Sequence, residues 1–329
     1  MKYAQYTQFG DPRDVINILE KDAPAPGPGQ VTIDVEAAPI HLADLYCLRG
    51  RDRFVMDLPA IPGFEGIGLV RELGDGVEDF RVGERVFFLP TTGAWTEVAL
   101  IGTDHVFPAP AGDASTLSLL PINPPTSYLI LEDFGDLQRG DWVIQNAANS
   151  NCGRYLISLA KRRGIRTVNI VRRPELIEDL KDIGADVVLV DGDDLPERVS
   201  LATGNAEISL AVDAVNGMAT SRLADCIKDD GTILAYGVLT GEHCMVPSDV
   251  LFLRNITLKG FWTIRQMQKR SRDQQREIYN LLANLMIAGD LPTRIAATYP
   301  LENVKDAVEH AGRKGADRDG KVILTMTRD

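Results

Sequence analysis

One segment of the sequence has the composition of a turn that binds phosphate groups. In VIQNAANSNCGRYLISLA (residues 143–160), an apolar run leads into small residues and then into a helical pattern. Small residues let the backbone approach a phosphate, and a neighbouring side chain can add a donor. An ordinary strand-to-helix turn has the same pattern, and the segment alone leaves that alternative open. The residues of this turn that we expect to contact a cofactor are Asn149, Ser150, Asn151, Cys152 and Gly153.

Two arginines follow the next apolar run along the chain, in NIVRRPE (residues 169–175). In an NAD site, an acidic residue near this position accepts a hydrogen bond from the ribose 2′-OH. Arg172 and Arg173 instead suit a 2′-phosphate, because guanidinium groups bind phosphate oxygens through paired hydrogen bonds. Two solvated surface arginines are the alternative interpretation. Together with the turn, the pair predicts NADPH as the cofactor.

Such a site needs a sheet that brings the two segments to one edge. From residue 119 to 254, apolar strand-like runs alternate with helical patterns, which predicts a parallel sheet covered by helices on both faces. In such a sheet the ligand binds at the carboxyl ends of the strands. We therefore expect residues 119–254 to form the cofactor domain.

Residues 1–118 have a different pattern. Short β-like runs are separated by turn signals such as APGPGQ and LGDGVEDF, so we expect a β-barrel-like domain. Residues 255–329 contain a predicted helix from about residue 273 to 289 and a last strand, KVILTM, and we expect them to return to the first domain. The predicted fold class is α/β, with a β-barrel domain and a doubly wound parallel sheet.

The composition excludes several classes of function. The chain has 329 residues, a net charge of −12 and 44% hydrophobic residues, which suits two folded domains. An acidic surface repels nucleic acids and anionic lipids, so neither is an expected partner. No apolar run is long enough to span a bilayer, and the N-terminal residues show no secretory signal. The four scattered cysteines indicate reduced thiols and a cytoplasmic location.

Several motifs together carry a resemblance to a known family. INPPTSYLIL, QNAANSNCG, NIVRRPE and LKGFW resemble, in order and spacing, motifs of the mitochondrial-type 2-enoyl thioester reductases. IPGFEGIGLV and GDGVEDFRVGERV resemble more general segments of the medium-chain dehydrogenase/reductase superfamily. The resemblance covers essentially the whole chain. It implies a GroES-like catalytic domain, a Rossmann domain, NADPH and a homodimer.

The resemblance also bears on metal binding. Zinc-dependent members of the superfamily hold the catalytic zinc with a Cys on the loop before an Asp and with a His just before a Glu. Those positions are His41 in IHLAD and Phe64 in GFEG here. Because a phenyl ring cannot ligate zinc and a catalytic site needs three protein ligands, we expect no metal. We expect His41 to be a hydrogen-bonded pocket residue, or to assist as a substrate contact or proton donor.

Without a metal Lewis acid, the expected reaction is reduction of a C=C bond conjugated to a carbonyl. Hydride adds to the β-carbon, so the carbonyl oxygen needs hydrogen-bond donors and the α-carbon needs a proton. The tyrosine of the enoyl reductase motif I-Q-G-x-Y is replaced here by Asp52, in CLRGRDRF, and an ionised carboxylate would repel the developing charge. Tyr46 resembles a tyrosine that lies near the nicotinamide in quinone reductases of the zeta-crystallin type. The candidate catalytic residues are Tyr46, as principal donor, with His41 and Asp52.

Three residues of the matching motifs complete the candidate site. For Asn123 and Thr126, the resemblance implies contact near the nicotinamide. Trp262, in LKGFW, matches a residue that lines the acyl pocket, with core packing as the alternative. The expected function is NADPH-dependent reduction of activated C=C bonds in a small molecule, with a 2-enoyl thioester as the leading substrate. A quinone reductase and a catalytically silent NADPH-binding protein are the alternatives.

Overall fold

A computed structural model of the protein describes residues 1–51, 56–89 and 93–326. The chain divides into two compact units. Unit 1 consists of residues 1–122, 276–287 and 294–329, and unit 2 consists of residues 123–275 and 288–293. The predicted C-terminal segment is therefore shared. Residues 255–275 belong to unit 2, whereas the chain from residue 294 onward belongs to unit 1.

Unit 1 is built mainly from β-strands. The strands are β1 (Lys2–Gln5), β2 (Asn17–Glu20), β3 (Gln30–Pro39), β4 (Gly66–Leu73), β5 (Arg85–Phe88), β6 (Val98–Gly102), β7 (Val106–Pro108), β14 (Ile295–Pro300) and β15 (Lys321–Thr325). The helices are α1 (Pro12–Val15), α2 (Leu42–Leu48), α3 (Ala114–Leu117), most of α11 (Arg272–Ile287) and α12 (Val304–Gly312). Short 3-10 turns are η1 (Thr103–His105), η3 (Leu301–Asn303) and η4 (Gly315–Arg318).

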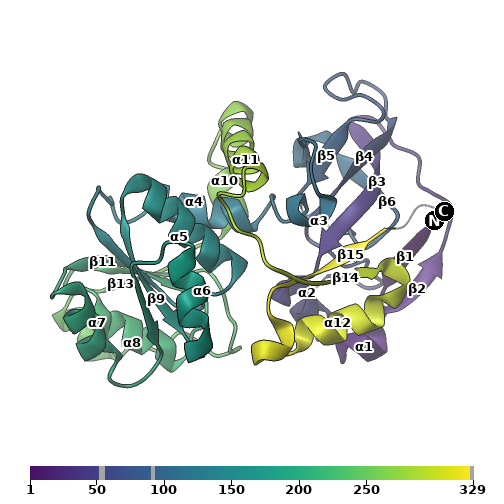
Figure 1. The fold of residues 1–329 in the computed structure, drawn as a ribbon. Coiled ribbons are helices and arrows are strands. Elements are labelled where there is room, and N and C mark those ends of the chain that lie inside the picture. The colour runs from purple at the N-terminus through teal and green to yellow at the C-terminus, as the bar shows by residue number, and fades with distance from the viewer. Residues whose placement is uncertain (52–55, 90–92, 327–329) are drawn as a thin grey trace. The chain divides into compact units, whose positions relative to one another are not determined.

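The larger sheet of unit 1 has the strand order β14-β15-β3-β4-β5-β7, with β6 also paired to β3 (Figure 1). Strand β3 is its centre, because it pairs with β4, β6 and β15. Val31, Ile33 and Val35 alternate along β3 and are buried in a core with Trp95 and Leu324. The antiparallel pairing of β3 with β4 and β15 sets the first residues of those two strands beside the end of β3.

Unit 2 alternates strands with helices, as the sequence predicts. The strands are β8 (Trp142–Gln145), β9 (Arg166–Val171), β10 (Val187–Val190), β11 (Ile208–Asp213), β12 (Thr232–Ala235) and β13 (Thr257–Gly260). The helices are α4 (Asn123–Asp133), α5 (Asn151–Arg163), α6 (Ile177–Asp182), α7 (Leu195–Thr203), α8 (Met218–Cys226), α9 (Ser248–Leu253) and α10 (Thr263–Met267), and a 3-10 turn, η2 (Pro174–Leu176), precedes α6.

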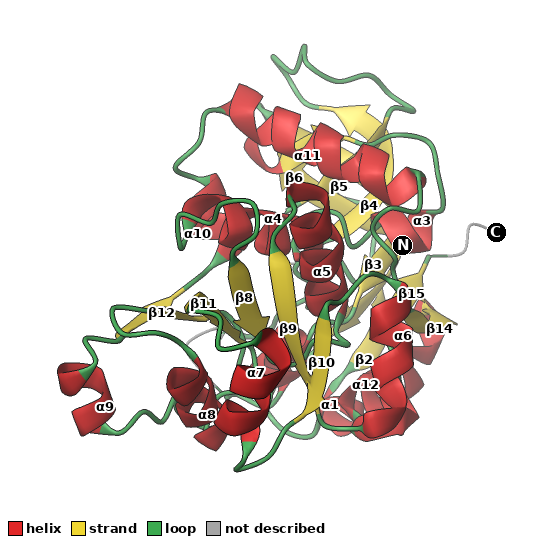
Figure 2. Ribbon diagram, turned by 60° about the vertical axis from the view of Figure 1, so that its left-hand side comes forward, coloured by secondary structure: helices red, strands yellow, loops and turns green. Residues whose placement is uncertain are grey.

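The strands of unit 2 form one parallel sheet in the order β10-β9-β8-β11-β12-β13. Figure 1 shows α5 and α6 on one side of this sheet and α7 and α8 on the other. Numbered along the chain, the strand order is 3-2-1-4-5-6, which is that of a dinucleotide-binding doubly wound sheet. Figure 2 shows the alternation of strand and helix that produces it. The predicted α/β fold class is confirmed.

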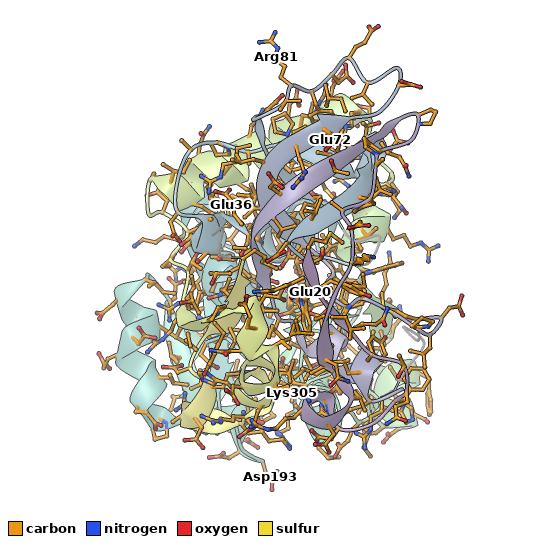
Figure 3. The ribbon with its side chains drawn as sticks, turned by 90° about the vertical axis from the view of Figure 1, so that its right-hand side faces the viewer. Glu20, Glu36, Glu72, Arg81, Asp193 and Lys305 are labelled. Carbon is orange, nitrogen blue, oxygen red and sulfur yellow. The ribbon has the colours of Figure 1, made fainter. Side chains whose placement is uncertain are left out.

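The acidic composition is distributed over the surface. Figure 3 labels exposed charged side chains that include Glu20, Glu72 and Lys305. Within the described part of the chain, no helix has both the length and the apolar composition of a membrane span.

Candidate active site

The predicted phosphate-binding turn connects β8 to α5 in unit 2. Ser150 caps α5, and its hydroxyl accepts a hydrogen bond from the Gly153 N–H at 3.1 Å. A Cβ at Gly153 would stand only 2.5 Å from the Ala148 carbonyl oxygen, so a side chain does not fit there. Ala147 adopts a positive φ of 49°, which tightens the turn. Gly153 therefore lets the first turn of α5 pack directly against the β8–α5 turn.

The arginine pair lies at the same edge of the sheet as this turn. Strands β8 and β9 are parallel, with Gln145 opposite Asn169, so both strands end at one edge. Arg172 follows the end of β9 and is exposed, and Arg173 is half-buried. An Arg173 guanidinium nitrogen lies 3.4 Å from a carboxylate oxygen of Glu175.

The other predicted cofactor residues gather around the start of α5. The sulfur of Cys152 lies 3.7 Å from the Asn123 carbonyl oxygen, at the first residue of α4. Thr126, one turn along α4, hydrogen-bonds the hydroxyl of Thr263. Trp262 directly precedes Thr263 and is 53% exposed, which argues against simple core packing. Unit 2 thus brings the turn, the start of α4 and the start of α10 together.

Two side chains of unit 2 that the sequence analysis did not select also belong to this region. The Tyr236 hydroxyl hydrogen-bonds the Ser150 side chain, and burial raises the pKa of Tyr236 well above its usual value. Asp213, fully buried at the end of β11, accepts hydrogen bonds from Asn146 and Thr220, each at 2.6 Å. Asp213 is the last residue of β11 and Tyr236 directly follows β12, and a place at the carboxyl end of a parallel strand is the signal that would have selected them.

Two of the candidate catalytic residues, His41 and Tyr46, lie directly before and within α2. His41 precedes the first residue of α2, and Tyr46 lies within the helix and is buried at 7% exposure. The His41 backbone N–H donates to Asp44 Oδ2 at 2.7 Å, and Asp44 Oδ1 accepts from the Gly63 N–H at 3.2 Å. Asp52 lies outside the described residues, and its predicted role stays a prediction.

Strand register brings two further charged residues to His41. In the β3–β15 pair, Ile323 lies opposite Pro39, so the same antiparallel register brings Lys321 to His41, two residues beyond the end of β3. In the β3–β4 pair, Ala37 lies opposite Ile67, which places Glu65 near the same end. The Lys321 Nζ–His41 Nδ1 distance is 2.7 Å, and His41 Nε2 contacts Glu65 Oε1. Both ring nitrogens of His41 are therefore engaged within the protein.

Burial controls the ionisation of this cluster. Desolvation raises the pKa of the fully buried Glu65 to about 8, against an opposing effect of the Lys321 ammonium. Desolvation likewise raises the pKa of Asp44 to about 6. For His41, desolvation and then Lys321 lower the pKa to about 3. At neutral pH the imidazole is neutral and Glu65 is mostly protonated, so their contact is a neutral hydrogen bond and not an ion pair.

Replacing Glu65 by glutamine is expected to flatten the pH dependence of stability between about pH 6.5 and pH 8. Glu65 titrates near pH 8 in the folded chain, against an ordinary value of 4.5. The folded state then holds a proton that the unfolded chain has lost, so the free energy of unfolding falls as the pH rises toward 8. Across this window the fall is roughly 2 kcal/mol. Asp44, with a pKa of about 6, and His41, with a pKa of about 3, hold few protons in the folded chain across this window. The unfolded-state titration of His41 near its ordinary pKa of 6.5 is common to wild type and variant, so it does not affect their difference.

Urea unfolding at both ends of this window measures the effect. Wild type should lose more stability than Glu65→Gln as the pH rises. Glu72→Gln, which changes an exposed carboxylate, serves as the control and should behave like wild type. The same pH slope for wild type and Glu65→Gln would show that Glu65 is ionised in the folded chain.

The ligand geometry of a metal site is not found in the part of the chain that the structure describes. No group of three His, Cys, Asp or Glu side chains there is arranged to hold a metal ion. Phe64 stands beside Glu65, at the position that matches the second zinc ligand of zinc-dependent members, and no disulfide joins the four cysteines.

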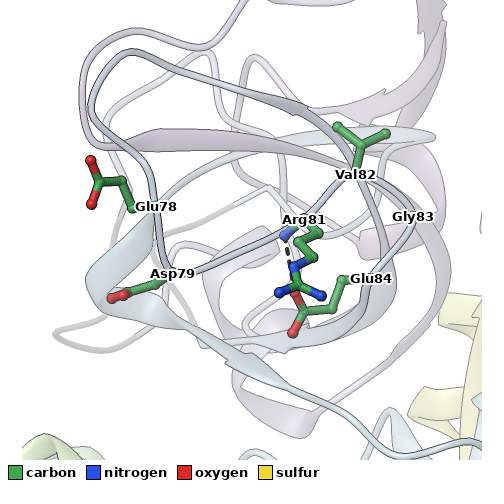
Figure 4. A pocket seen from close by; sticks show the side chains of 6 residues that line it. All are labelled: Glu78, Asp79, Arg81, Val82, Gly83 and Glu84. Atoms are coloured by element: carbon green, nitrogen blue, oxygen red, sulfur yellow. Dashed lines mark hydrogen bonds between the residues drawn. The ribbon is translucent and has the colours of Figure 1, made fainter.

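A surface hollow of about 580 Å³ lies elsewhere in unit 1 (Figure 4). It is lined by one loop, residues 78–84, in which the Arg81 N–H donates to a Glu84 carboxylate oxygen at 3.0 Å. None of the candidate site residues lines it, so this hollow carries no part of the candidate chemistry.

Sequence reasoning missed Asp44, Glu65 and Lys321. Glu65 is part of the GFEG motif, and Asp44 is part of IHLAD, so both stand in segments that the resemblance had marked. Lys321 is 280 residues from His41, and only the pairing of β15 with β3 brings it to the cluster.

Comparison with known proteins identifies the family. Residues 27–111 match the alcohol dehydrogenase GroES-like domain, and residues 152–283 match the zinc-binding dehydrogenase domain. The mitochondrial enoyl-[acyl-carrier-protein] reductase of Xenopus tropicalis is 31% identical over 334 residues, covering 98% of this chain and 94% of that protein. The zinc in the second domain name describes that family, whereas Phe64 replaces a ligand here.

Solved structures agree with this assignment. A Bacillus thuringiensis protein named as an NADPH:quinone reductase has a TM-score of 0.92 and 28% identity, with 99% of each chain covered. The quinone oxidoreductase of Escherichia coli in complex with NADPH, at 21% identity, has a TM-score of 0.88, with 99% of this chain and 100% of that chain covered, and shares the fold. The chain therefore belongs to the medium-chain dehydrogenase/reductase superfamily, and within it to the family of the mitochondrial-type enoyl reductases.

Proposed function

We propose that the protein is an NADPH-dependent reductase of activated C=C bonds, with 2-enoyl thioesters as its substrates. The observation that carries the proposal is 31% identity, over almost the whole chain, to an enoyl-[acyl-carrier-protein] reductase. The β8–α5 turn supports it, because Gly153 lets the turn pack directly against the N-terminus of α5, where backbone N–H groups favour a phosphate. NADPH, when bound, supplies the hydride.

The residues of this chain would divide the remaining tasks. The backbone N–H groups at the start of α5, with Asn149, Ser150 and Asn151, would hold the pyrophosphate. Arg172 and Arg173 would hold the 2′-phosphate. Asn123, Thr126, Cys152 and Gly153 stand with the turn in unit 2 and would line the cofactor site.

The chemistry at the substrate needs a donor for the carbonyl oxygen and a proton for the α-carbon. Tyr46 would donate a hydrogen bond to the carbonyl oxygen as negative charge develops there. The exposed ring of Trp262 would line the acyl pocket. Tyr46 would also fit a quinone substrate, and the Bacillus thuringiensis relative is named for that activity, so NADPH:quinone reduction is the second candidate.

One assay separates these functions. NADPH oxidation is followed with crotonyl thioester, with a quinone and without acceptor, each with and without chelator. We expect rapid oxidation with the crotonyl thioester and unchanged turnover with chelator. NADPH oxidation that is accelerated by the quinone and not by the crotonyl thioester would establish the second candidate. NADPH binding without oxidation in any mixture would indicate a catalytically silent NADPH-binding protein, and loss of turnover with chelator would show that a metal takes part.

We further propose a homodimer that pairs two copies of β13. Within the described residues β13 is the last strand of its sheet, and all four of its residues are exposed. Such an edge offers its backbone groups to another strand. Phe252 and Leu253, in the helix just before it, are 70% and 74% exposed, so pairing would also cover apolar surface.

Light scattering tests the dimer. We expect about twice the chain mass of 36.1 kDa at micromolar concentration. Phe252→Glu with Leu253→Glu should shift the protein toward one chain, whereas Leu201→Glu, which changes an 85% exposed leucine of α7, should leave it dimeric. A wild-type protein with the mass of a single chain would contradict the proposal.

We also propose that the protein works in the cytoplasm as a reductase of small molecules. The four cysteines, none joined by a disulfide in the structure, support a reducing compartment. Because the matched relatives are named mitochondrial, fractionation of cells that express the tagged full chain is the test. Recovery with mitochondria would overturn the cytoplasmic location.

A further inference from the structure

The imidazole of His41 is held from both sides by titratable side chains of other segments, Lys321 at the start of β15 and Glu65 directly before β4. Lys321 Nζ lies 2.7 Å from Nδ1, and Glu65 Oε1 contacts Nε2. The side chain of His41 is 13% exposed and that of Glu65 is fully buried. Neither ring nitrogen is left to hydrogen-bond a substrate, so a direct role for His41 as proton donor does not fit this arrangement.

The chemistry of the two partners decides where the ring proton resides. An ammonium group has three donors and no acceptor, so Nδ1 must accept from Lys321 through its lone pair. A neutral imidazole then carries its proton on Nε2, and that N–H donates to Glu65 Oε1. This tautomer is compatible with Glu65 in either protonation state, because one carboxyl oxygen always accepts.

The same contacts fix the beginning of α2. Lys321 Nζ also donates to the Ile40 carbonyl oxygen at 3.3 Å, directly before His41. The His41 N–H donates to Asp44 Oδ2, within the first turn of α2. Three segments of unit 1 thus meet here: the end of β3 with α2, the residues before β4, and the first residue of β15.

We propose that Lys321 is a positioning residue: with Glu65 it holds His41 as the neutral Nε2–H tautomer and anchors the start of the helix that carries Tyr46. Lys321 acts through His41 and touches no substrate. The link to catalysis rests on the proposed function, since it assumes that Tyr46 is the donor. The tautomer of His41 and the anchoring of α2 do not depend on that assumption.

The charged neighbours determine what removal of Lys321 does. Facing the ring are Lys321 from β15, Glu65 from the segment before β4 and Asp44 from α2, and Tyr6 in turn interacts with Asp44 and Cys47. Lys321 lowers the pKa of His41 and also that of Glu65. Replacing it by methionine should therefore raise both pKa values and leave Nδ1 without its donor.

Nitrogen NMR of the imidazoles tests the tautomer directly. The chain has four histidines, and His41→Gln identifies the His41 signals. In wild type we expect His41 to stay neutral across pH 5 to 8 with the proton on Nε2, and in Lys321→Met we expect a mixture of tautomers and a titration at higher pH. A wild-type His41 that protonates near its ordinary pKa of 6.5, or that carries its proton on Nδ1, would overturn the proposal.

Kinetic measurements test whether Lys321 anchors the start of α2. Lys321→Met should lower kcat at least tenfold with the Kd of NADPH within twofold, because a misplaced catalytic group costs rate without costing cofactor binding. Lys321→Arg, which keeps a cationic donor, should recover part of kcat. Lys2→Met, which breaks the surface pair of Lys2 with Glu302, is the matched control and should retain wild-type kcat.

The two proposals fail in different ways. A chain that reduces neither enoyl thioester nor quinone would end the proposed function, while the wild-type spectra would still decide the tautomer. A chain that is an active reductase but whose Lys321→Met variant keeps full kcat would end the positioning role alone. Should Lys321→Met not fold, the kcat of Lys321→Arg still tests the positioning role, and the wild-type spectra still test the tautomer.

Discussion

Replacing Tyr46 by phenylalanine is expected to lower kcat by about 100-fold, with the Kd of NADPH within twofold of wild type. The change removes one hydroxyl and keeps the ring, so the buried packing of α2 should survive. A donor to the carbonyl oxygen matters most when negative charge develops there. The loss should therefore appear in turnover and not in cofactor binding.

Among the three candidate donors to the substrate carbonyl oxygen, the contacts and the side-chain chemistry favour Tyr46. Lys321 and Glu65 engage both ring nitrogens of His41. Asp52, once ionised, accepts hydrogen bonds and donates none. A tyrosine hydroxyl is a donor at neutral pH, and Tyr46 leaves the helix roughly 200° around from Asp44, away from the face that the charged cluster uses.

Tyr299→Phe is the matched control for this experiment. The Tyr299 hydroxyl hydrogen-bonds His310 Nδ1 at 3.0 Å, so this change also removes one tyrosine hydroxyl from unit 1. We expect it to keep wild-type kcat. Full turnover in Tyr46→Phe, with a large loss in Asp52→Asn or His41→Ala, would move the donor to one of those residues.

Much of the fold follows from local patterns in the sequence. The helix predicted from about residue 273 to 289 is α11, Arg272–Ile287, and the predicted last strand is β15. Apolar residues recur at helical spacing in α11, and β15 contains a short continuous apolar run. The parallel sheet followed from apolar runs separated by helical patterns, because strands buried on both faces have few polar positions.

The charged cluster at His41 could not be predicted in the same way. Its contacts depend on which strand lies beside β3 and in what register, and neither is encoded in a local pattern. A slip of one residue in the β3–β15 pair would turn Lys321 to the other face of the sheet. Sequence reasoning therefore identified His41 from its position in a motif and described its partners only as a pocket.

Replacing both Arg172 and Arg173 by alanine is expected to raise the Kd of NADPH at least tenfold and to leave the Kd of NADH nearly unchanged. The two cofactors differ by the 2′-phosphate. Each charge-assisted hydrogen bond to it contributes roughly 1.5 to 3 kcal/mol. Since about 1.4 kcal/mol corresponds to a factor of ten in Kd, the loss of one such contact already gives the minimum effect.

The surroundings of the two arginines predict unequal contributions. Arg173 lies 3.4 Å from the Glu175 carboxylate, which competes with a phosphate for the same guanidinium. Arg172 is exposed at the end of β9. We therefore expect Arg172→Ala to account for the larger part of the change, and Glu175→Gln to strengthen NADPH binding by removing a carboxylate that competes with the phosphate for Arg173.

Arg166→Ala is the matched control, because Arg166 begins the same strand that Arg172 follows. The Arg166 guanidinium lies over the Trp142 ring, with its carbon 5.4 Å from the ring centroid, at the amino end of β9. A ligand at the carboxyl ends of the strands is out of its reach, so both Kd values should stay at wild-type levels. Equal wild-type affinities for NADPH and NADH would mean that the arginines are solvated surface charges. A weaker binding of both cofactors in the double variant would mean instead that the pair shapes the adenosine site without reading the 2′-phosphate.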